Sequence, residues 1–243
     1  LGASVVVGAV VLTALGIDAA DTLSGRSGTL LSQLAGSSTE QSCPEGMTSM
    51  QSQTASCIDI FEASPDNRCV HADPHNALET KENLESVACF GVSKEGVLPW
   101  RNITRDQAVL ACAKAGKRLP TNAEWYQAVL GTPDTKSDVV CNVASDEPRK
   151  GGESACESAS GAYDMVGNVW EWVTEDAIDG MYDGRVLPSA GYVTQIDSHG
   201  VALRSGTNGD ELFNDDYVWT DTSGAYGMMR GGFYGSESDA GVY

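Results

Sequence analysis

The chain has 243 residues, and its hydrophobic fraction of 41% is enough to build a core, which excludes wholesale disorder. Thirty-four acidic residues against 15 basic ones give a formal net charge of −19. Such a charge repels nucleic acid and anionic lipid, so both are excluded as partners. Twenty-seven glycines and only four phenylalanines indicate a loop-rich domain rather than a helical bundle.

The N-terminal segment is strongly apolar. Residues 1–17 carry no charge, and apolar positions continue to Leu34, which predicts a helix over residues 1–36 that is apolar all round at first and amphipathic later. The uncharged run is shorter than the ~20 residues of a membrane span. Three interpretations stay open: a pilin-like assembly helix, a plain membrane anchor and a retained targeting peptide. We favour the assembly helix, which predicts a homo-oligomeric filament and membrane contact only through this segment.

A polar linker and then the main domain follow. Residues 37–56 are rich in Ser, Thr and Gln, which is typical of a linker. The domain is expected over residues 57–243 and opens with an alternating strand, CIDIFEAS, at residues 57–64. The acidic stretch from Pro65 to Glu85 is predicted to be a long loop.

Two helices are predicted next. The first covers residues 102–116, with Thr104 as its N-cap and Gly116 as its C-cap. The second starts at Thr121, and Glu124 three residues later completes a capping box. Beyond Gly131 the short apolar runs between turns predict irregular β structure. Together these elements predict an α+β domain preceded by a long apolar helix.

The cysteines suggest the compartment. None of the seven belongs to a C-x-x-C pair, so zinc or redox chemistry is not favoured. In a loop-rich acidic domain they predict a disulfide framework formed outside the cytoplasm, with one thiol left over. An extracellular location, on the cell surface or in a surface filament, follows from this. The sequon at Asn102, Asn-Ile-Thr, is then a candidate glycosylation site.

Three segments carry a family resemblance. GKRLPTNAEWYQAV at residues 116–129, GAYDMVGNVWEWVTE at residues 161–175 and MRGGFYG at residues 229–235 occur in this order, preceded by PWRNIT. They resemble blocks of the formylglycine-generating-enzyme and sulfatase-modifying-factor family over roughly residues 57–243. The resemblance implies a C-type lectin-like fold.

The resemblance also implies calcium. The ligands of one family calcium site fall on Asp164, Gly167, Val169 and Glu171, two of them as main-chain oxygens. Oxygen-only ligation suits a hard cation such as Ca²⁺. A second family site would start at Asn142 and Val143. Without an ion, Glu171 would instead accept hydrogen bonds from loop amides.

The family pattern accounts for the odd cysteine. In relatives, the helix cysteine that matches Cys112 is bonded to a cysteine on a final strand, and this sequence holds no such partner. The resemblance therefore implies that Cys112 is free. The other six then pair by proximity, as Cys43–Cys57, Cys69–Cys89 and Cys141–Cys156.

The same comparison of residues bears on catalysis. The family's oxidase activity uses paired cysteine thiolates in the last third, which bind copper(I). Here the last cysteine is Cys156. Ergothioneine-type relatives use a separate iron-binding domain with a histidine triad, which we do not find. His71 and His75 are poor metal ligands because Pro74 interrupts any helix between them. We therefore expect a protein that is not an enzyme.

Aromatic residues gather near the C-terminus among Ser, Asp and Gly, a composition typical of paratopes. They resemble the variable segment of retroelement-diversified ligand-binding proteins, and the candidate ligand-binding residues are Tyr217, Trp219, Tyr226, Phe233, Tyr234 and Tyr243. Alternatively, half of them are core residues. The leading prediction is a surface protein whose lectin-like head binds an extracellular protein or glycan. A purely structural filament subunit and a catalytically divergent enzyme of the family are the alternatives.

Overall fold

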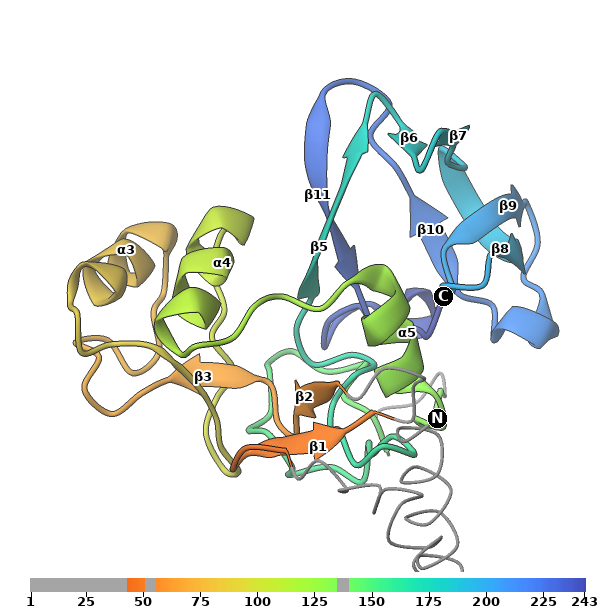
Figure 1. Ribbon diagram of the computed structural model, residues 1–243. Coiled ribbons are helices and arrows are strands. Elements are labelled where there is room, and N and C mark those ends of the chain that lie inside the picture. Colours follow the sequence, from red (N-terminus) through yellow and green to blue (C-terminus); the bar gives the residue numbers. More distant parts are fainter. Residues whose placement is uncertain (1–42, 51–55, 135–139) are drawn as a thin grey trace, which may run out of the picture. The chain divides into compact units, whose positions relative to one another are not determined.

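The computed structural model describes residues 43–50, 56–134 and 140–243 (Figure 1). The predicted N-terminal helix over residues 1–36 lies outside these residues, so assembly through it stays a prediction. Residues 43–243 form one compact unit. Within the described ranges, no helix is both long enough and apolar enough to cross a membrane.

Two short antiparallel pairs begin the domain. Strand β1 (Met47–Ser49) pairs with β2 (Cys57–Asp59), and β3 (Ala63–Pro65) pairs with β4 (Gly91–Ser93). Strand β1 lies inside the segment expected to be a linker. Its cross-strand pairing and the Cys43–Cys57 disulfide draw it into the domain, which therefore begins at Cys43 rather than Cys57.

The acidic stretch contains a helix where a loop was predicted. Helix α3 (Ala77–Glu85) begins at Asn76, whose side chain accepts hydrogen bonds from the amides of Leu78 and Glu79. This segment has few apolar residues, so its periodicity is weak and the prediction failed. Capping and tertiary contacts stabilise the helix instead of a wide apolar face.

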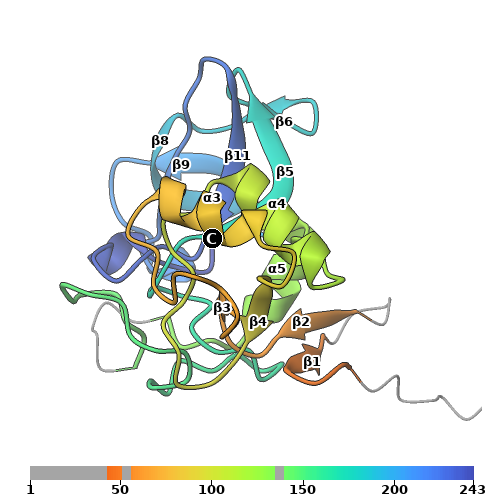
Figure 2. The ribbon, with the colours of Figure 1, turned by 90° about the vertical axis from the view of Figure 1, so that its left-hand side faces the viewer.

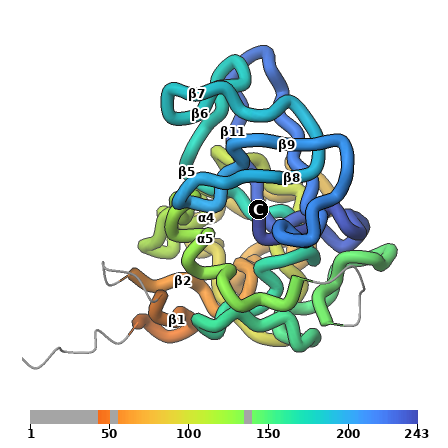
Figure 3. Tube along the Cα trace, turned by 90° about the vertical axis from the view of Figure 1, so that its right-hand side faces the viewer, coloured from red at the N-terminus to blue at the C-terminus, as the bar shows by residue number. Residues whose placement is uncertain are grey.

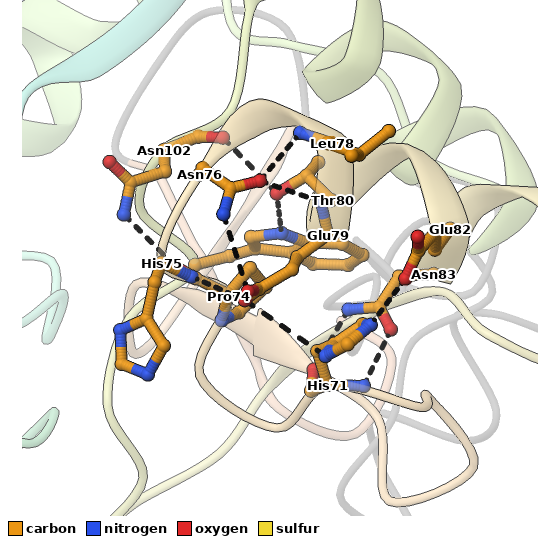
Figure 4. A network of polar contacts seen from close by, with 11 residues as sticks. His71, Pro74, His75, Asn76, Leu78, Glu79, Thr80, Glu82, Asn83 and Asn102 are labelled. Atoms are coloured by element: carbon orange, nitrogen blue, oxygen red, sulfur yellow. Dashed lines mark hydrogen bonds and ion pairs between the residues drawn. The ribbon is translucent and has the colours of Figure 1, made fainter.

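Those tertiary contacts are specific. Asn83 on α3 is fully buried and clamps His71, because its Oδ1 accepts from the His71 amide at 2.8 Å and its Nδ2 donates to the His71 carbonyl at 2.8 Å (Figure 4). Thr80 accepts a hydrogen bond from the indole nitrogen of Trp100 at 3.1 Å. These bonds fasten α3 to the rest of the domain, and the Cys69–Cys89 disulfide closes its segment.

The two predicted helices and their N-caps are confirmed, but the first is shorter than residues 102–116 and its C-cap is Ala115 rather than Gly116. Helix α4 (Arg105–Lys114) starts at Thr104 with a capping box to Gln107, and α5 (Asn122–Val129) starts at Thr121 with a capping box to Glu124. Figure 2 shows α3 and α4 near one another on one side of the domain, where the chain runs on from α4 into α5.

Two larger antiparallel sheets form the second half of the domain. One has the order β11-β5-β6-β7 and the other β10-β8-β9 (Figures 1 and 3). The strands are β5 (Glu171–Ile178), β6 (Met181–Tyr182), β7 (Arg185–Val186), β8 (Ala190–Ile196), β9 (Ala202–Gly206), β10 (Tyr217–Trp219) and β11 (Ala225–Arg230), with short 3₁₀ turns η1 (Glu211–Phe213) and η2 (Glu237–Asp239). The domain is thus α+β, as expected from the sequence.

The core joins α5 to the GAYDMVGNVWEW block. Trp125, Val129, Val143, Val166 and Val173 are completely buried in one cluster. Gly167 has φ +80°, and a Cβ there would lie 2.4 Å from the carbonyl oxygen of Asn142, so only glycine fits. This packing places the residues before β5 close to α5.

The cysteines pair as Cys43–Cys57, Cys69–Cys89 and Cys141–Cys156, and Cys112 is free. These are the three pairs expected from proximity along the chain, and the free Cys112 is the one that the family resemblance implied.

Replacing Asn83 by Ala should destabilise the domain by about 2 kcal/mol, because the amide and carbonyl of His71 lose their buried partner. Thermal unfolding should move down by roughly 4–8 °C. The control is Leu78→Ala on the same helix, whose side chain is 62% exposed. Equal shifts for the two variants would contradict the clamp.

Candidate functional site

A pocket of about 610 Å³ lies between the two larger sheets. Its walls come from β5, β10, β11, the start of β9 and the segment that ends at Tyr243. Aromatic side chains dominate the lining: Trp170, Trp172, Tyr217, Trp219, Tyr226 and Tyr243. Three of these side chains are the indoles of Trp170, Trp172 and Trp219, which makes this pocket a candidate binding site.

The aromatic walls hold one another in place. The rings of Trp170 and Trp219 meet edge to face, with centroids 5.3 Å apart and planes at 81°. Tyr217 is held in the same way by Tyr192. The indole nitrogen of Trp172 donates to the carbonyl oxygen of Ile103 at 3.1 Å. These contacts position the aromatic side chains that line the pocket, with the planes of Trp170 and Trp219 nearly perpendicular to each other.

Four of the six aromatic residues predicted to bind a ligand line this pocket: Tyr217, Trp219, Tyr226 and Tyr243. Phe233 and Tyr234 do not belong to its lining. Phe233 instead stacks against Trp170, with centroids 6.4 Å apart, and Tyr234 packs against Phe233. They support the wall from behind.

Trp170 and Trp172 also line the pocket, although they were not among the ligand-binding residues predicted from the sequence. They are two residues apart at the start of β5, and alternate residues of a strand face the same side. The alternation of Trp170 and Trp172 with Glu171 was therefore the sequence feature from which their place in one pocket wall could have been predicted.

Charged groups are few in the pocket. Asp221 and Asp239 contribute carboxylates, and Arg230 contributes the only lysine or arginine side chain among its lining residues. Hydrogen bonds from the Ser223 amide and hydroxyl lower the pKa of Asp221, which keeps it ionised. No cysteine or histidine occurs in the lining.

Arg230 is buried and satisfied by the protein. It donates to Oδ1 of Asn122 at 3.1 Å and to the carbonyl oxygens of Gly200 and Val242 at 2.9 and 3.0 Å. Its guanidinium lies over the Trp125 ring, 4.6 Å from the centroid. Burial lowers its pKa to about 10, so it stays charged at neutral pH. Arg230 therefore joins α5, β11 and the terminal segment.

A second group of polar residues lies around the GAYDMVGNVWEW block. Glu62 accepts hydrogen bonds from the Asn168 side chain and the Val169 amide, and Glu171 accepts one from the indole nitrogen of Trp125. Burial, followed by the charges of Asp164 and Glu171, raises the pKa of Glu62 well above its ordinary value. Glu62 was not predicted to be a site residue, although it lies within the first predicted strand, residues 57–64.

The other two carboxylates behave alike. Burial raises the pKa of Asp164, although Ser154 and the Gly152 amide donate to it at 2.6 and 3.1 Å. Burial, and secondarily the Asp164 charge, raises the pKa of Glu171 to about 8, while Trp125 opposes this. Three mutually repelling carboxylates are thus held near each other.

The predicted calcium ligands fall into two sets. Asp164, Gly167, Val169 and Glu171 lie on the turn before β5, at this acidic cluster. Asn142 uses its side chain within the protein, donating to Glu147 and Asn168 and accepting from Ser145. The second site, at Asn142 and Val143, therefore fits less well and stays a prediction. Among the described residues, no three His, Cys, Asp or Glu side chains are arranged to hold a metal.

The polar network near α3 bears on two further residues (Figure 4). His71 contacts Glu82 at 2.7 Å, while the His75 ring points away from it, so the two rings do not converge. Asn102 donates from its side-chain nitrogen to the Pro74 carbonyl at 2.9 Å. Glycosylation of Asn102, still a prediction, would have to replace this bond.

Comparison with known proteins supports the family resemblance. The model of the sulfatase-modifying factor enzyme 1-like domain matches residues 67–240. Hercynine oxygenase of Mycobacterium tuberculosis is 34% identical over 91 residues, which cover 31% of this chain and 21% of that protein. The Mycolicibacterium smegmatis hercynine oxygenase is 28% identical over 160 residues, which cover 59% and 32%. The chain thus spans at most about a third of these relatives.

Among solved structures, the Major Tropism Determinant P3c variant matches with a TM-score of 0.41 and 17% identity, over 82% of this chain and 47% of that chain. A similarity of this size supports no inference about function.

The relatives correct two predictions. A protein that is not an enzyme, acting as a surface filament subunit or adhesin, is the wrong interpretation, because the curated relatives are oxygenases. The wrong prediction came from the missing cysteine pair, because the absence of one kind of reacting group does not show that a protein lacks catalytic activity.

Replacing Arg230 by Lys should cost about 3 kcal/mol in the free energy of unfolding, because a lysine cannot reach three acceptors and cover the Trp125 ring at once. Chemical denaturation measures it. Arg118→Lys, in an exposed pair with Glu124, is the control and should cost less than about 1 kcal/mol. A neutral result for Arg230→Lys would contradict its joining role.

Proposed function

Because the chain belongs to the sulfatase-modifying factor enzyme family, we propose that it is the substrate-binding domain of a divergent enzyme and that the aromatic pocket receives a small organic cation. The observation that carries this proposal is the pair of perpendicular indoles, Trp170 and Trp219, in a pocket with two carboxylates. Family membership also supports the finer C-type lectin-like assignment of the fold.

The aromatic walls suit a cation. The faces of Trp and Tyr rings carry negative electrostatic potential, and several rings around one site attract a quaternary ammonium group by about 0.5–2 kcal/mol each. A quaternary ammonium group has no N–H to donate. A pocket that holds it therefore needs aromatic faces more than hydrogen-bond acceptors, and this lining supplies them.

The electrostatics favour the same ligand class. Asp221 and Asp239 add negative charge to the pocket. The one positive side chain, Arg230, is occupied by three protein acceptors and a ring, so its charge is directed into the core. The net charge of −19 raises the local concentration of cations around the whole chain.

The names of the relatives support a ligand with a quaternary ammonium group as well. These relatives are named as oxygenases of hercynine, a betaine that carries a trimethylammonium group. The pocket lining supplies neither thiol nor imidazole, so in our proposal its residues bind and orient the substrate. The reacting group comes from a cofactor or from protein outside these residues.

We also propose that calcium binds at Asp164 and Glu171, with the main-chain oxygens of Gly167 and Val169. The donor types support this proposal, because oxygen ligands suit calcium, and because burial and neighbouring negative charge raise the pKa of Glu62 and Glu171. A divalent cation would neutralise this charge and hold the turn that leads into Trp170 and Trp172. Its role is structural, and no reaction step passes through it.

An extracytoplasmic location is part of the proposal. Three disulfides in the described residues support it, because disulfides persist in oxidising compartments.

Replacing Trp219 by Ala should weaken the binding of choline and of hercynine roughly tenfold, because the aromatic pocket loses one of its indole rings. Isothermal titration calorimetry measures this. Val87→Ala, at a 95% exposed side chain outside the pocket, is the matched control.

The ligand control is the neutral carbon isostere of choline, which fills the same volume without charge. The native protein should bind this isostere more weakly than it binds choline. In Trp219→Ala the difference between the two affinities should be smaller. Equal affinity of the native protein for both compounds would refute the cation preference.

Adding calcium should raise the melting temperature of the native protein by about 5–10 °C when calcium is at roughly 100 times its dissociation constant. Glu171→Gln should remove most of this shift because one ligand charge is lost. Glu147→Gln, at an exposed carboxylate, serves as the control. A calcium shift that survives in Glu171→Gln would refute the assignment.

A further inference from the structure

A second pair of carboxylates lies apart from the acidic cluster at Glu62. Asp216, just before β10, is fully buried, and Asp134 lies on the segment after α5. We propose that Asp134 and Asp216 share one proton and together fasten residues 241–243 to the pocket wall, and that alkaline pH releases this segment.

The geometry starts from two consecutive backbone amides. The amide of Tyr243 donates to Oδ2 of Asp216 at 2.8 Å, and the amide of Val242 donates to Oδ2 of Asp134 at 3.2 Å. Because neighbouring residues bind the two carboxylates, these must lie close together. Asn214 adds a third donor, to Asp134 at 2.8 Å.

The segment packs directly on the buried carboxylate. A Cβ at Gly241 would lie 1.9 Å from Oδ1 of Asp216, so no side chain fits there. The Tyr243 ring lies between Phe213 and Tyr126, with centroid distances of 5.3 and 6.1 Å. Gly241 and Tyr243 also line the aromatic pocket. The two carboxylates thus hold part of the pocket wall.

One oxygen of the pair has no partner. Oδ1 of Asp216 makes no hydrogen bond within the part of the chain that the structure describes, although the residue is fully buried. An ionised oxygen in that position loses its hydration without compensation. A proton on the pair removes one charge and leaves a hydroxyl that can donate to the other carboxylate.

The charges around Asp134 and Asp216 also favour one shared proton on this pair. The groups facing Asp216 are Asp134 from the segment after α5, Arg230 from β11, and the Tyr243 side chain, which in turn faces Tyr126 from α5. Arg230 supplies one positive charge against two carboxylates and donates to the Val242 carbonyl rather than to either acid. One proton therefore balances the buried charge.

The pH window follows from the shifted group. Burial, and next the Asp134 charge, raises the pKa of Asp216 from 3.8 to about 9. Between these values the folded state binds more protons than the unfolded chain, so stability falls as pH rises through the window. The stabilisation is fully present when the pH is below the pKa of Asp216 in the unfolded chain. It is lost as the pH rises through the pKa of Asp216 in the folded protein.

The test is hydrogen exchange on the full chain, followed at the Val242 and Tyr243 amides at about pH 6 and about pH 9 and corrected for the intrinsic exchange rate. In the native protein, protection of these amides should fall at least about tenfold at the higher pH. The Asp216→Asn side chain resembles the protonated acid and keeps an oxygen that can accept the hydrogen bond from the Tyr243 amide. In this variant the Val242 and Tyr243 amides should be protected from exchange equally at both pH values. Asp106→Asn, at an exposed carboxylate, should behave like the native protein.

Three results would overturn the proposal. Protection in the native protein could be independent of pH, or Asp216→Asn could keep the native pH dependence. Protection at about pH 6 could also be lost on adding a chelator, which would assign a metal ion in place of the proton. If Asp216→Asn does not fold, Asp134→Asn removes the same repulsion and carries the same expectation. None of these outcomes depends on what the pocket binds.

Discussion

The stacking of Arg230 on Trp125 is the contact on which the second half of the domain depends. The guanidinium lies over a completely buried ring, and its donors reach Asn122 at the start of α5, Gly200 before β9 and Val242 in the terminal segment. A buried charge is tolerated only when it is fully bonded. That requirement brings four separate stretches of chain to one point, and the aromatic pocket forms beside it.

Trp125 also connects the pocket to the acidic cluster. Its indole nitrogen donates to Glu171, while the neighbours of Glu171 in the chain, Trp170 and Trp172, line the pocket. The indoles of Trp170 and Trp172 therefore lie toward the pocket, whereas Glu171 between them lies toward Trp125 and the buried carboxylates. A change in the charge of Glu171 would therefore affect the position of Trp170 and Trp172, its neighbours in the chain, and so the shape of the pocket.

The missing cysteine pair led to the wrong prediction that the protein is not an enzyme. No cysteine follows Cys156 in this sequence, and this absence was the ground for expecting a protein without catalytic activity. It does not remove the fold's capacity to bind a substrate. The relatives are enzymes of which this chain spans at most about a third, so the reacting group need not lie within it.

Local signals in the sequence determined the family, the α+β class, the capped helices α4 and α5, and four of the pocket aromatics, because caps, motifs and composition act over a few residues. The tertiary structure alone decided the rest. Helix α3 depends on the Asn83 clamp and a disulfide, not on its own periodicity. The roles of Glu62, Asp134 and Asp216 arise from burial beside partners that are distant in the chain, such as Asp164 for Glu62 and Asp134 for Asp216, and no local pattern encodes such burial.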